Sequence, residues 1–346
     1  MLACLNDNSF DRARSHVPFP SGSVGHPARG YCVLSAETIG QAAHRAIVPA
    51  DVAQVRRSGS GRVVLSYSFR MIPDVLLVGC GDLGADIGLR LAGLGHRVVA
   101  IRRNADRVPP PLIGVSADLT REAPSLPDLD LGHLVIALSA SSRTEDAYRA
   151  IYVNGLGRAL DSLDEKGQRP SRAVLVSSTR VFGTSDPSII CTEDTTTEPS
   201  DAPARVLVEA EQLFASRVPH GTILRLAGLY GRGPARLVDK VARGEVTDPN
   251  RWTNRIHRED AAAAVVHLLT RPQPPGPLYV GADDEPALLG NVAAYIAARL
   301  ALPSPPPADP EHTHGKRLSN ALLRASGWLP TYPTFREGYA DYPNHE

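Results

Sequence analysis

Short apolar runs alternate with longer segments of helical period from Met71 onward. The apolar runs are continuous and cover residues 74–79, 97–102, 133–138, 173–178 and 222–228. Continuous runs of this length are typical of parallel strands that helices cover on both faces. Between them, apolar residues recur at helical spacing over residues 82–94, 144–165 and 204–217. The repeated order of strand and helix predicts an α/β fold with a doubly wound parallel sheet.

The regularity weakens after residue 228, where proline and glycine become dense. We expect a helix over residues 260–270 capped by Asp260, a strand over 277–282, a helix near 289–300, and a last helix capped by Ser319. These shorter elements predict a smaller C-terminal lobe.

Residues 1–70 differ from the rest in composition. They hold eight arginines against four acidic residues and show no sustained periodicity. One interpretation is a targeting or interaction arm. We favour a disordered extension or a start codon placed upstream of a true beginning at Met71, because MIPDVLLVG is a natural opening for an α/β domain.

Composition and charge exclude several classes of partner. The 346 residues are 42% hydrophobic and 21% charged, which predicts a soluble globular protein. The 37 basic residues balance the 37 acidic ones, so the overall charge favours neither nucleic acid nor an anionic membrane. No apolar run approaches the roughly 20 residues that span a bilayer, and the four cysteines lack the spacing of a metal site or a disulfide framework. We therefore expect a cytoplasmic protein without a metal.

A glycine motif follows the first apolar run. It reads Gly79-Cys80-Gly81-Asp82-Leu83-Gly84, a G-x-G-x-x-G between a strand and a helix within a complete βαβ unit. The first glycine permits the tight turn, the second admits a pyrophosphate close to the backbone, and the third allows the helix to pack on the sheet. The pattern predicts a Rossmann-type dinucleotide-binding domain over residues 71–230, which leaves residues 231–346 for the smaller C-terminal lobe. The alternative is a tight turn that is glycine-rich by chance.

The end of the second strand indicates which dinucleotide binds. An acidic residue there would accept hydrogen bonds from the ribose 2′-hydroxyl of NAD, but this chain has Arg102 and Arg103. A guanidinium suits a 2′-phosphate, so NADP is preferred and NAD stays possible. Both arginines could also be solvated loop ends. Asp118, followed by Leu119, stands where the third strand should end and could hold the adenine amino group or cap a turn.

Seven stretches together resemble a known family. They are the glycine motif, Asp118-Leu119, YVNG (152–155), SSTRVFG (177–183), LRLAGLYGRG (224–233), NRIHREDAA (254–262), and GKRLSN with GW (315–328). In this order the chain resembles the extended short-chain dehydrogenase/reductases, and more closely the atypical members of the NAD-dependent epimerase/dehydratase family. The resemblance covers about residues 71–340. It implies a Rossmann domain that binds NAD(P) and a C-terminal lobe that closes over a substrate, a nucleotide sugar in many relatives.

The resemblance also implies a catalytic serine and a Tyr-x-x-x-Lys pair, in which the lysine lowers the pKa of the tyrosine. Ser178 matches the serine, but Pro203 and Leu207 stand at the tyrosine and lysine positions. None of the ten tyrosines has a lysine four residues later. Phe182 replaces a further tyrosine of the family, and the acidic pair of the dehydratases falls at Thr179 and Arg180.

Other residues could take the place of the missing Tyr-x-x-x-Lys pair or complete the active site. His257 is the best titratable candidate for catalysis, because imidazole works near neutrality with little tuning; by resemblance it more often supports a loop. Arg225 could contact substrate or brace a loop, and Asn154 matches a structural asparagine of the family.

The sequence thus predicts an NAD(P)-binding oxidoreductase or epimerase-like enzyme with an atypical active site. Its partners would be a dinucleotide and a small substrate with a carbonyl or hydroxyl group. The alternative is a non-catalytic NADP(H)-binding sensor. The predicted catalytic residues are Ser178 and His257, and the predicted substrate contacts are Ser178, Thr179 and Arg225. The predicted cofactor residues are Gly79, Gly81, Asp82, Leu83, Gly84, Arg102, Arg103, Asp118, Leu119, Ala137 and Leu138.

Overall fold

The computed structural model describes residues 52–57, 63–67, 72–183, 186–231 and 236–340. The chain divides into two compact units, Met1–Met71 and Ile72–Glu346. In the first unit, β1 (Val52–Arg57) pairs antiparallel with β2 (Val63–Tyr67). The other residues of the 1–70 segment lie outside the described ones, so the expectation for this segment stays a prediction.

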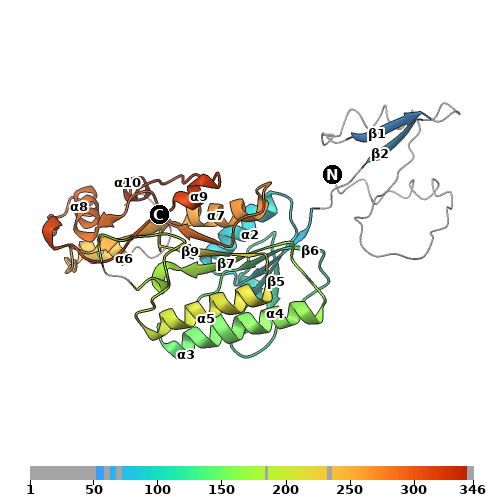
Figure 1. The fold of residues 1–346 in the computed structure, drawn as a ribbon, viewed down its shortest axis with the longest axis horizontal. Helices are drawn as coiled ribbons and strands as arrows, with labels where there is room; N and C mark the ends of the chain where they lie inside the picture. The colour runs from blue at the N-terminus through green and yellow to red at the C-terminus, as the bar shows by residue number, and fades with distance from the viewer. Residues whose placement is uncertain (1–51, 58–62, 68–71, 184–185, 232–235, 341–346) are drawn as a thin grey trace. The chain divides into compact units, whose positions relative to one another are not determined.

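A seven-stranded parallel sheet forms the centre of the second unit (Figure 1), in the order β13-β9-β7-β6-β3-β4-β5. The strands are β3 (Asp74–Val78), β4 (Val98–Arg102), β5 (Ile113–Ser116), β6 (Leu131–Ile136), β7 (Arg172–Ser178), β9 (Gly221–Leu226) and β13 (Leu278–Gly281). The chain order reverses between β3 and β6, and in such sheets ligands bind at this switch point, beyond the carboxyl ends of the strands. The predicted Rossmann-type α/β fold is confirmed.

Helices cover both faces of the sheet, which explains why its strands are continuously apolar (Figure 1). On one face lie α2 (Asp82–Gly93) and α7 (Arg258–Thr270), whose apolar side chains share a core cluster with β3 and β4. On the other face lie α4 (Leu156–Glu165) and α5 (Ala202–Arg217), which share a second cluster with β6 and β7. The sheet therefore sits between two helical layers.

The single helix predicted over residues 144–165 is interrupted. Thr144 caps α3 (Glu145–Tyr148), the segment η4 (Arg149–Gly155) is π-helical, and α4 follows directly. A π-helical turn rotates the side chains that follow it relative to a regular helix, and such turns are frequent at functional sites. The interruption lies beside the switch point described above, since Tyr152 donates a hydrogen bond to the carbonyl oxygen of Leu138, just beyond β6.

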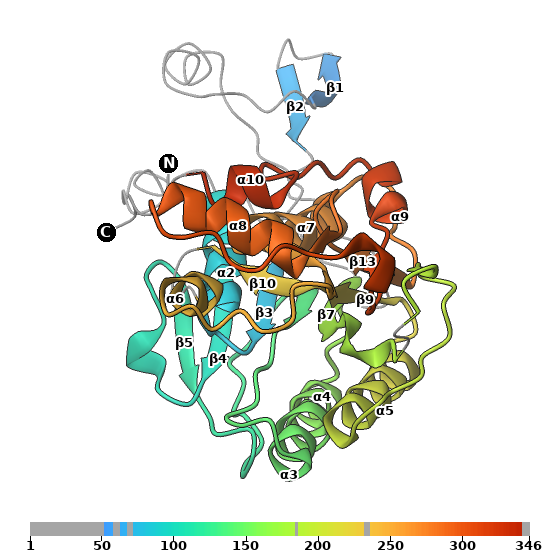
Figure 2. The same cartoon turned by 90° about the vertical axis from the view of Figure 1, so that its left-hand side faces the viewer.

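The C-terminal elements build a smaller apolar cluster of their own. It joins α6 (Arg236–Ala242), α8 (Leu289–Arg299) and α10 (Phe335–Gly338), which gather beyond one end of the sheet (Figures 1 and 2). Short strand pairs connect this region to the rest: β10 (Gly228–Tyr230) with β12 (Arg255–His257), β11 (Trp252–Thr253) with β14 (Ala287–Leu288), and β8 (Ile190–Cys191) with β15 (Arg317–Leu318). However, α7 and β13 return to the central sheet. The predicted domain boundary at residue 230 stays a prediction.

Two helix starts differ from the predictions. Helix α7 begins two residues earlier than expected, with His257 as its N-cap, so Asp260 is not the cap. The Asp260 carboxylate is buried and accepts hydrogen bonds from the backbone amides of Thr331 and Tyr332. The short helix α9 (Ala321–Ala325) has Asn320 at its N-cap, although the Ser319 hydroxyl still accepts from the Ala321 amide at 3.2 Å.

Among the described residues, no helix is both long and apolar enough to cross a membrane.

Candidate functional site

The turn between β3 and α2 is so tight that two of its glycines leave no room for a side chain. Gly79 has a φ of +98°, and a Cβ on it would lie 2.4 Å from the carbonyl oxygen of Ala137. A Cβ on Gly84 would lie 2.1 Å from the carbonyl oxygen of Gly79. Gly81 is different, because apart from its two chain neighbours no atom of the described residues lies within 4 Å of the position that its Cβ would take. The turn therefore holds helix against strand and leaves open space at Gly81.

Helix α2 begins at this open space. Gly81 is its N-cap and makes no side-chain capping hydrogen bond. The first bond of the helix runs from the amide of Ala85 to the carbonyl oxygen of Gly81 at 2.8 Å, which leaves the earlier amides without a partner inside the helix. Free amides and the positive end of the helix dipole together favour an anion at this point.

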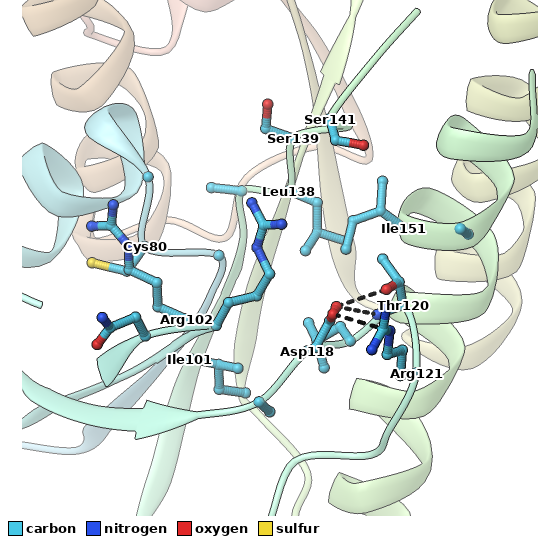
Figure 3. Close-up of a pocket in the computed structure, with 18 of the residues that line it drawn as sticks. Cys80, Ile101, Arg102, Asp118, Thr120, Arg121, Leu138, Ser139, Ser141 and Ile151 are labelled. Carbon is cyan, nitrogen blue, oxygen red and sulfur yellow. Dashed lines mark hydrogen bonds and ion pairs between the residues drawn. The ribbon is translucent and has the colours of Figure 1, made fainter. Parts of the chain in front are cut away.

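A cavity of about 730 Å³ extends from the turn across the ends of β4 and β5 (Figure 3). Its walls contain the predicted residues Gly79, Gly81, Arg102, Arg103, Asp118, Leu119, Ala137 and Leu138. Arg107 and Arg121 also line it, so four guanidinium groups border one cavity. The side chain of Arg102 is oriented by a hydrogen bond of 3.0 Å from its Nη1 to the carbonyl oxygen of Arg107. The cavity thus combines an open glycine turn with a strongly basic rim.

Asp118 contributes the one acidic side chain that the described residues place in this cavity wall. The Thr120 hydroxyl donates to Asp118 Oδ1 at 2.7 Å and the Thr120 amide donates to the same oxygen at 3.1 Å. The hydrogen bond from this hydroxyl is the main cause that lowers the pKa of Asp118. The carboxylate is therefore ionised at neutral pH and accepts hydrogen bonds.

A second cavity, of about 600 Å³, continues from the first along the carboxyl edge of the sheet. The two share Gly81, Ala137, Leu138 and Ser139, and the second also reaches the ends of β7 and β9. Asp82, Leu83 and Gly84 line it together with Ser177 and Ser178. The two cavities form one elongated groove with the glycine turn at its middle.

Ser178, the predicted catalytic serine, lies in the wall of the second cavity. Its hydroxyl also accepts from the amide of Arg180 at 3.2 Å, which caps the short turn η5 (Thr179–Val181). Ser177 lies beside it, but its hydroxyl donates to the buried carboxylate of Glu211 at 2.5 Å. Of the two hydroxyls, that of Ser178 is the one tied only to a local backbone amide in the described structure.

Other predicted residues take structural positions. Thr179 is buried in η5 and does not belong to the wall of either cavity. His257 is 5% exposed, accepts from the amide of Glu259 through Nδ1, and stacks on Tyr332 with ring centroids 3.8 Å apart. It is absent from both cavity walls as well. Its position favours a supporting role, here at the start of α7, over a catalytic one, and the catalytic role stays a prediction.

Arg225 is also absent from the walls of both cavities, although its neighbour Leu226 lines the second one. Its guanidinium forms a buried ion pair with Glu211, with an Nη2–Oε2 distance of 2.7 Å, and lies 5.0 Å from the ring centroid of Phe182. The carboxylate satisfies the charge and both side chains are under 9% exposed, which favours the bracing role that was the alternative, and a substrate contact by Arg225 stays a prediction. The ion pair joins β9 to α5, as a brace between sheet and helix.

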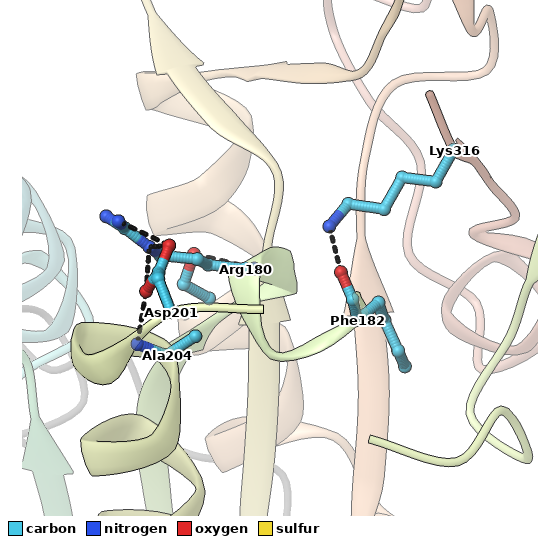
Figure 4. A network of polar contacts seen from close by, with 6 residues as sticks. Arg180, Phe182, Asp201, Ala204 and Lys316 are labelled. Carbon is cyan, nitrogen blue, oxygen red and sulfur yellow. Dashed lines mark hydrogen bonds and ion pairs between the residues drawn. The ribbon is translucent and has the colours of Figure 1, made fainter. Parts of the chain in front are cut away.

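The positions that would hold the Tyr-x-x-x-Lys pair contain apolar side chains. Pro203 is buried at the start of α5, and Leu207 lies in the wall of the second cavity. Among the described residues, no lysine lines that wall. Lys316 instead donates a hydrogen bond to the carbonyl oxygen of Phe182 (Figure 4), and burial lowers the pKa of its ammonium. Nearby, Arg180 forms a bidentate pair with Asp201, the N-cap of α5 (Figure 4).

Arg258 and Tyr152 also line the second cavity, and neither was predicted from the sequence as a site residue. Arg258, the first residue of α7, reaches Asp82 of α2 with an Nη1–Oδ2 distance of 3.3 Å. Tyr152 points its hydroxyl toward the carbonyl oxygen of Leu138 at 3.3 Å. Both lie in motifs that the sequence analysis noted, NRIHRED and YVNG, but only the packing of α2 with α7 and the π-helical turn place them in the groove.

Solved structures similar to this chain share its fold. One is a provisionally assigned NAD-dependent epimerase/dehydratase from Methylobacillus flagellatus, with 32% identity, a TM-score of 0.66, and coverage of 78% of this chain and 96% of that one. Another is the human epimerase family protein SDR39U1, solved with NADPH, with 18% identity, a TM-score of 0.62, and coverage of 77% and 97%. A third is the Thermus thermophilus UDP-glucose 4-epimerase, solved with NAD, with 19% identity, a TM-score of 0.60, and coverage of 77% and 96%.

No protein-family model matches the chain, and no curated protein matches it. The human and Thermus structures, below a quarter identity, support the fold alone. The Methylobacillus protein is nearly one-third identical over almost its whole length. The chain therefore belongs to the NAD-dependent epimerase/dehydratase family.

Proposed function

We propose that this protein is an NADP(H)-binding oxidoreductase whose dinucleotide lies in the groove formed by the two cavities. The open space at Gly81 carries this proposal. The turn has no room for a Cβ at Gly79 or Gly84, but it has room at Gly81. Because Gly81 is the glycine at the helix N-terminus, a ligand has space there. The diphosphate would meet the free amides of α2, with the adenosine half toward Asp118.

The basic rim of the first cavity supports NADP over NAD. Arg102 is the last residue of β4 and Arg103 follows it, where an NAD-binding site of this fold carries an acidic residue. Two guanidinium groups at this point would pair with a 2′-phosphate, and Arg107 and Arg121 add positive charge to the same cavity. Asp118, as an ionised acceptor, suits the adenine amino group.

The second cavity would hold the nicotinamide and a small substrate with a carbonyl or hydroxyl group, of which a sugar-nucleotide-like compound is one class. When bound, the nicotinamide supplies or accepts a hydride. Ser178 would orient the substrate oxygen through its hydroxyl. Because Leu207 and Pro203 stand where the family pair would be, we do not expect the standard acid–base chemistry of the epimerases. A reductase with a different proton donor fits these residues better.

A non-catalytic NADP(H) sensor is the second candidate. Leu229, 44% exposed, lines the cavity near Ser178 and gives the groove an apolar rim that a partner could cover. A sensor would bind NADPH and turn over no carbonyl compound, whereas a reductase would lose turnover on Ser178→Ala.

Calorimetric titration of the full chain with NADPH and NADH tests the proposal directly. We expect NADPH to bind at least about tenfold more tightly, a difference of about 1.4 kcal/mol. The double variant Arg102→Gln with Arg103→Gln should lose most of this preference and keep its affinity for NADH. Absence of heat with both nucleotides would refute dinucleotide binding, and equal affinity in the wild type would refute the NADP preference alone.

A further inference from the structure

Among the described residues, Tyr152 is the only tyrosine in the wall of the second cavity, where it lies with Ser177, Ser178 and Leu207. Its ring packs against both apolar clusters that flank it, so the side chain is held in place while its hydroxyl lies at the groove. A phenol and a serine hydroxyl thus border the same space. On α5, Pro203 and Leu207 stand where the family has its tyrosine and lysine, so these two positions supply neither a phenol nor an ammonium.

We propose that Tyr152, carried by the π-helical segment rather than by α5, is the proton donor of this active site. The proposal rests on the proposed function, because it needs a nicotinamide dinucleotide in the same groove. In the reductive direction a C–H bond of the reduced nicotinamide would break and its hydride would add to the carbonyl carbon, which leaves NADP⁺, while the π electron pair of the C=O bond would move to oxygen. That oxygen takes the phenolic proton of Tyr152, and the phenolate regains a proton from water.

The proton of Tyr152 is only weakly held by the protein. The hydroxyl donates to the carbonyl oxygen of Leu138 at 3.3 Å, longer than the roughly 2.5–3.0 Å that is usual for an O–H···O bond. Rotation about the C–O bond would turn the proton toward a substrate oxygen at little cost. The backbone carbonyl is not a base, so it orients the phenol without removing its proton.

Burial keeps the Tyr152 phenol protonated. Removal from water is the main cause that raises the pKa of Tyr152 to about 12. At pH 7 only about 10⁻⁵ of the phenol would be ionised, so it is a poor base and a constantly available acid. The phenol therefore has its proton in place when a carbonyl substrate needs one.

An experiment without substrate separates this role from a structural one. Tyrosine labelled with ¹³C at Cζ reports ionisation of each phenol, and Tyr152→Phe assigns the resonance. Oxidised NADP⁺ carries a positive ring and NADPH does not, so saturation with NADP⁺ should lower the Tyr152 pKa by about one unit or more relative to NADPH. Identical titration in both saturated complexes would overturn the proposal. Failure of both nucleotides to bind would instead overturn the proposed function.

Turnover provides the second readout, with 4-nitrobenzaldehyde and methylglyoxal as probes of NADPH oxidation. Tyr152→Phe keeps the packed ring and should lower kcat by about 10²-fold or more while the Kd for NADPH changes less than about twofold. The matched control is Tyr148→Phe, whose ring lies 5.1 Å from that of Tyr152 but outside the cavity wall, and it should keep kcat.

The dependence of kcat on pH provides a third readout, because a packing defect would not produce the direction of change that loss of a proton donor predicts. Wild-type kcat should stay level between about pH 7 and pH 9, because the phenol remains protonated, and the residual kcat of Tyr152→Phe should rise as pH falls, because solvent must then supply the proton. Unchanged kcat in Tyr152→Phe, or a wild type that binds NADPH and reduces neither probe, would overturn the proposal.

Discussion

Gly81 and Gly84 offer a matched test of the dinucleotide site, because the structure assigns them opposite responses to an added side chain. At Gly81 no atom of the described residues other than its chain neighbours lies within 4 Å of the added Cβ, and φ is −79°, which any residue adopts. Gly81→Val should therefore leave the free energy of unfolding of the free protein within about 0.5 kcal/mol of wild type. At Gly84 the added Cβ would lie 2.1 Å from a backbone oxygen that cannot move aside, and Gly84→Ala should cost about 1–3 kcal/mol.

Thermal unfolding with and without NADPH reads both effects. A ligand at about 100 times its Kd stabilises the folded state by about 2.7 kcal/mol. For a folded unit of this size, 1 kcal/mol corresponds to about 2 °C, so wild type should gain about 5 °C. Gly81→Val should match the wild-type Tm without ligand and gain less than about 1 °C with it, because the valine occupies the approach of the diphosphate. Gly84→Ala should start about 2–6 °C lower.

The result that would refute this reasoning is a Gly81→Val protein that NADPH stabilises as much as it stabilises wild type. The open space at Gly81 would then not be where the diphosphate lies. A Gly81→Val protein that is itself unstable would show that the space is filled by the protein rather than by a ligand.

Three further predictions concern buried charge and the groove. Glu211→Ala should lower the free energy of unfolding in urea by about 3–5 kcal/mol, because it leaves the Arg225 guanidinium buried and unpaired, and replacing both partners by apolar residues should recover most of the loss. Burial lowers the pKa of His133 from 6.5 to about 4. The unfolded chain therefore protonates this histidine at a higher pH than the folded chain does, and the free energy of unfolding should fall by about 2 kcal/mol from about pH 7.5 to pH 5. His133→Phe should remove this effect. Arg258→Gln should raise the Kd for NADPH about tenfold in calorimetry. Asp82→Asn should lower this Kd slightly, because the ion pair of Asp82 with Arg258 is partly exposed and competes with a bound phosphate for the guanidinium.

The strands and the glycine turn could be predicted because their causes are local. A strand covered on both faces is apolar at every position, and β3, β4, β6, β7 and β9 were each recognised within a few residues by that pattern. The three glycines of the turn also express a local steric requirement. The large cavity shows that most of the predicted cofactor residues line one space, while their contact with a dinucleotide stays a prediction.

The chemistry at the far end of the groove could not be predicted in the same way. Arg225 follows the pattern of a residue at a strand end, yet Glu211 on α5 neutralises it, and nothing near Arg225 in sequence signals that partner. His257 was considered as a base because of its type, but its position as N-cap of α7 and its stacking on Tyr332 depend on chain segments far apart in the sequence.

The sequence by itself determined the class of fold, the turn that would hold a diphosphate and the absence of the usual tyrosine and lysine pair, because periodicity, glycine spacing and residue identity are local properties. Only the tertiary structure decided which side chains line the groove around Ser178 and Asp82. Tyr152 and Arg258 are brought to Ser178 and Asp82 by a π-helical turn and by the packing of α7 on α2. Such placements depend on a rotation of a helix or an approach of two helices, which contacts between distant segments determine and no short stretch of sequence encodes.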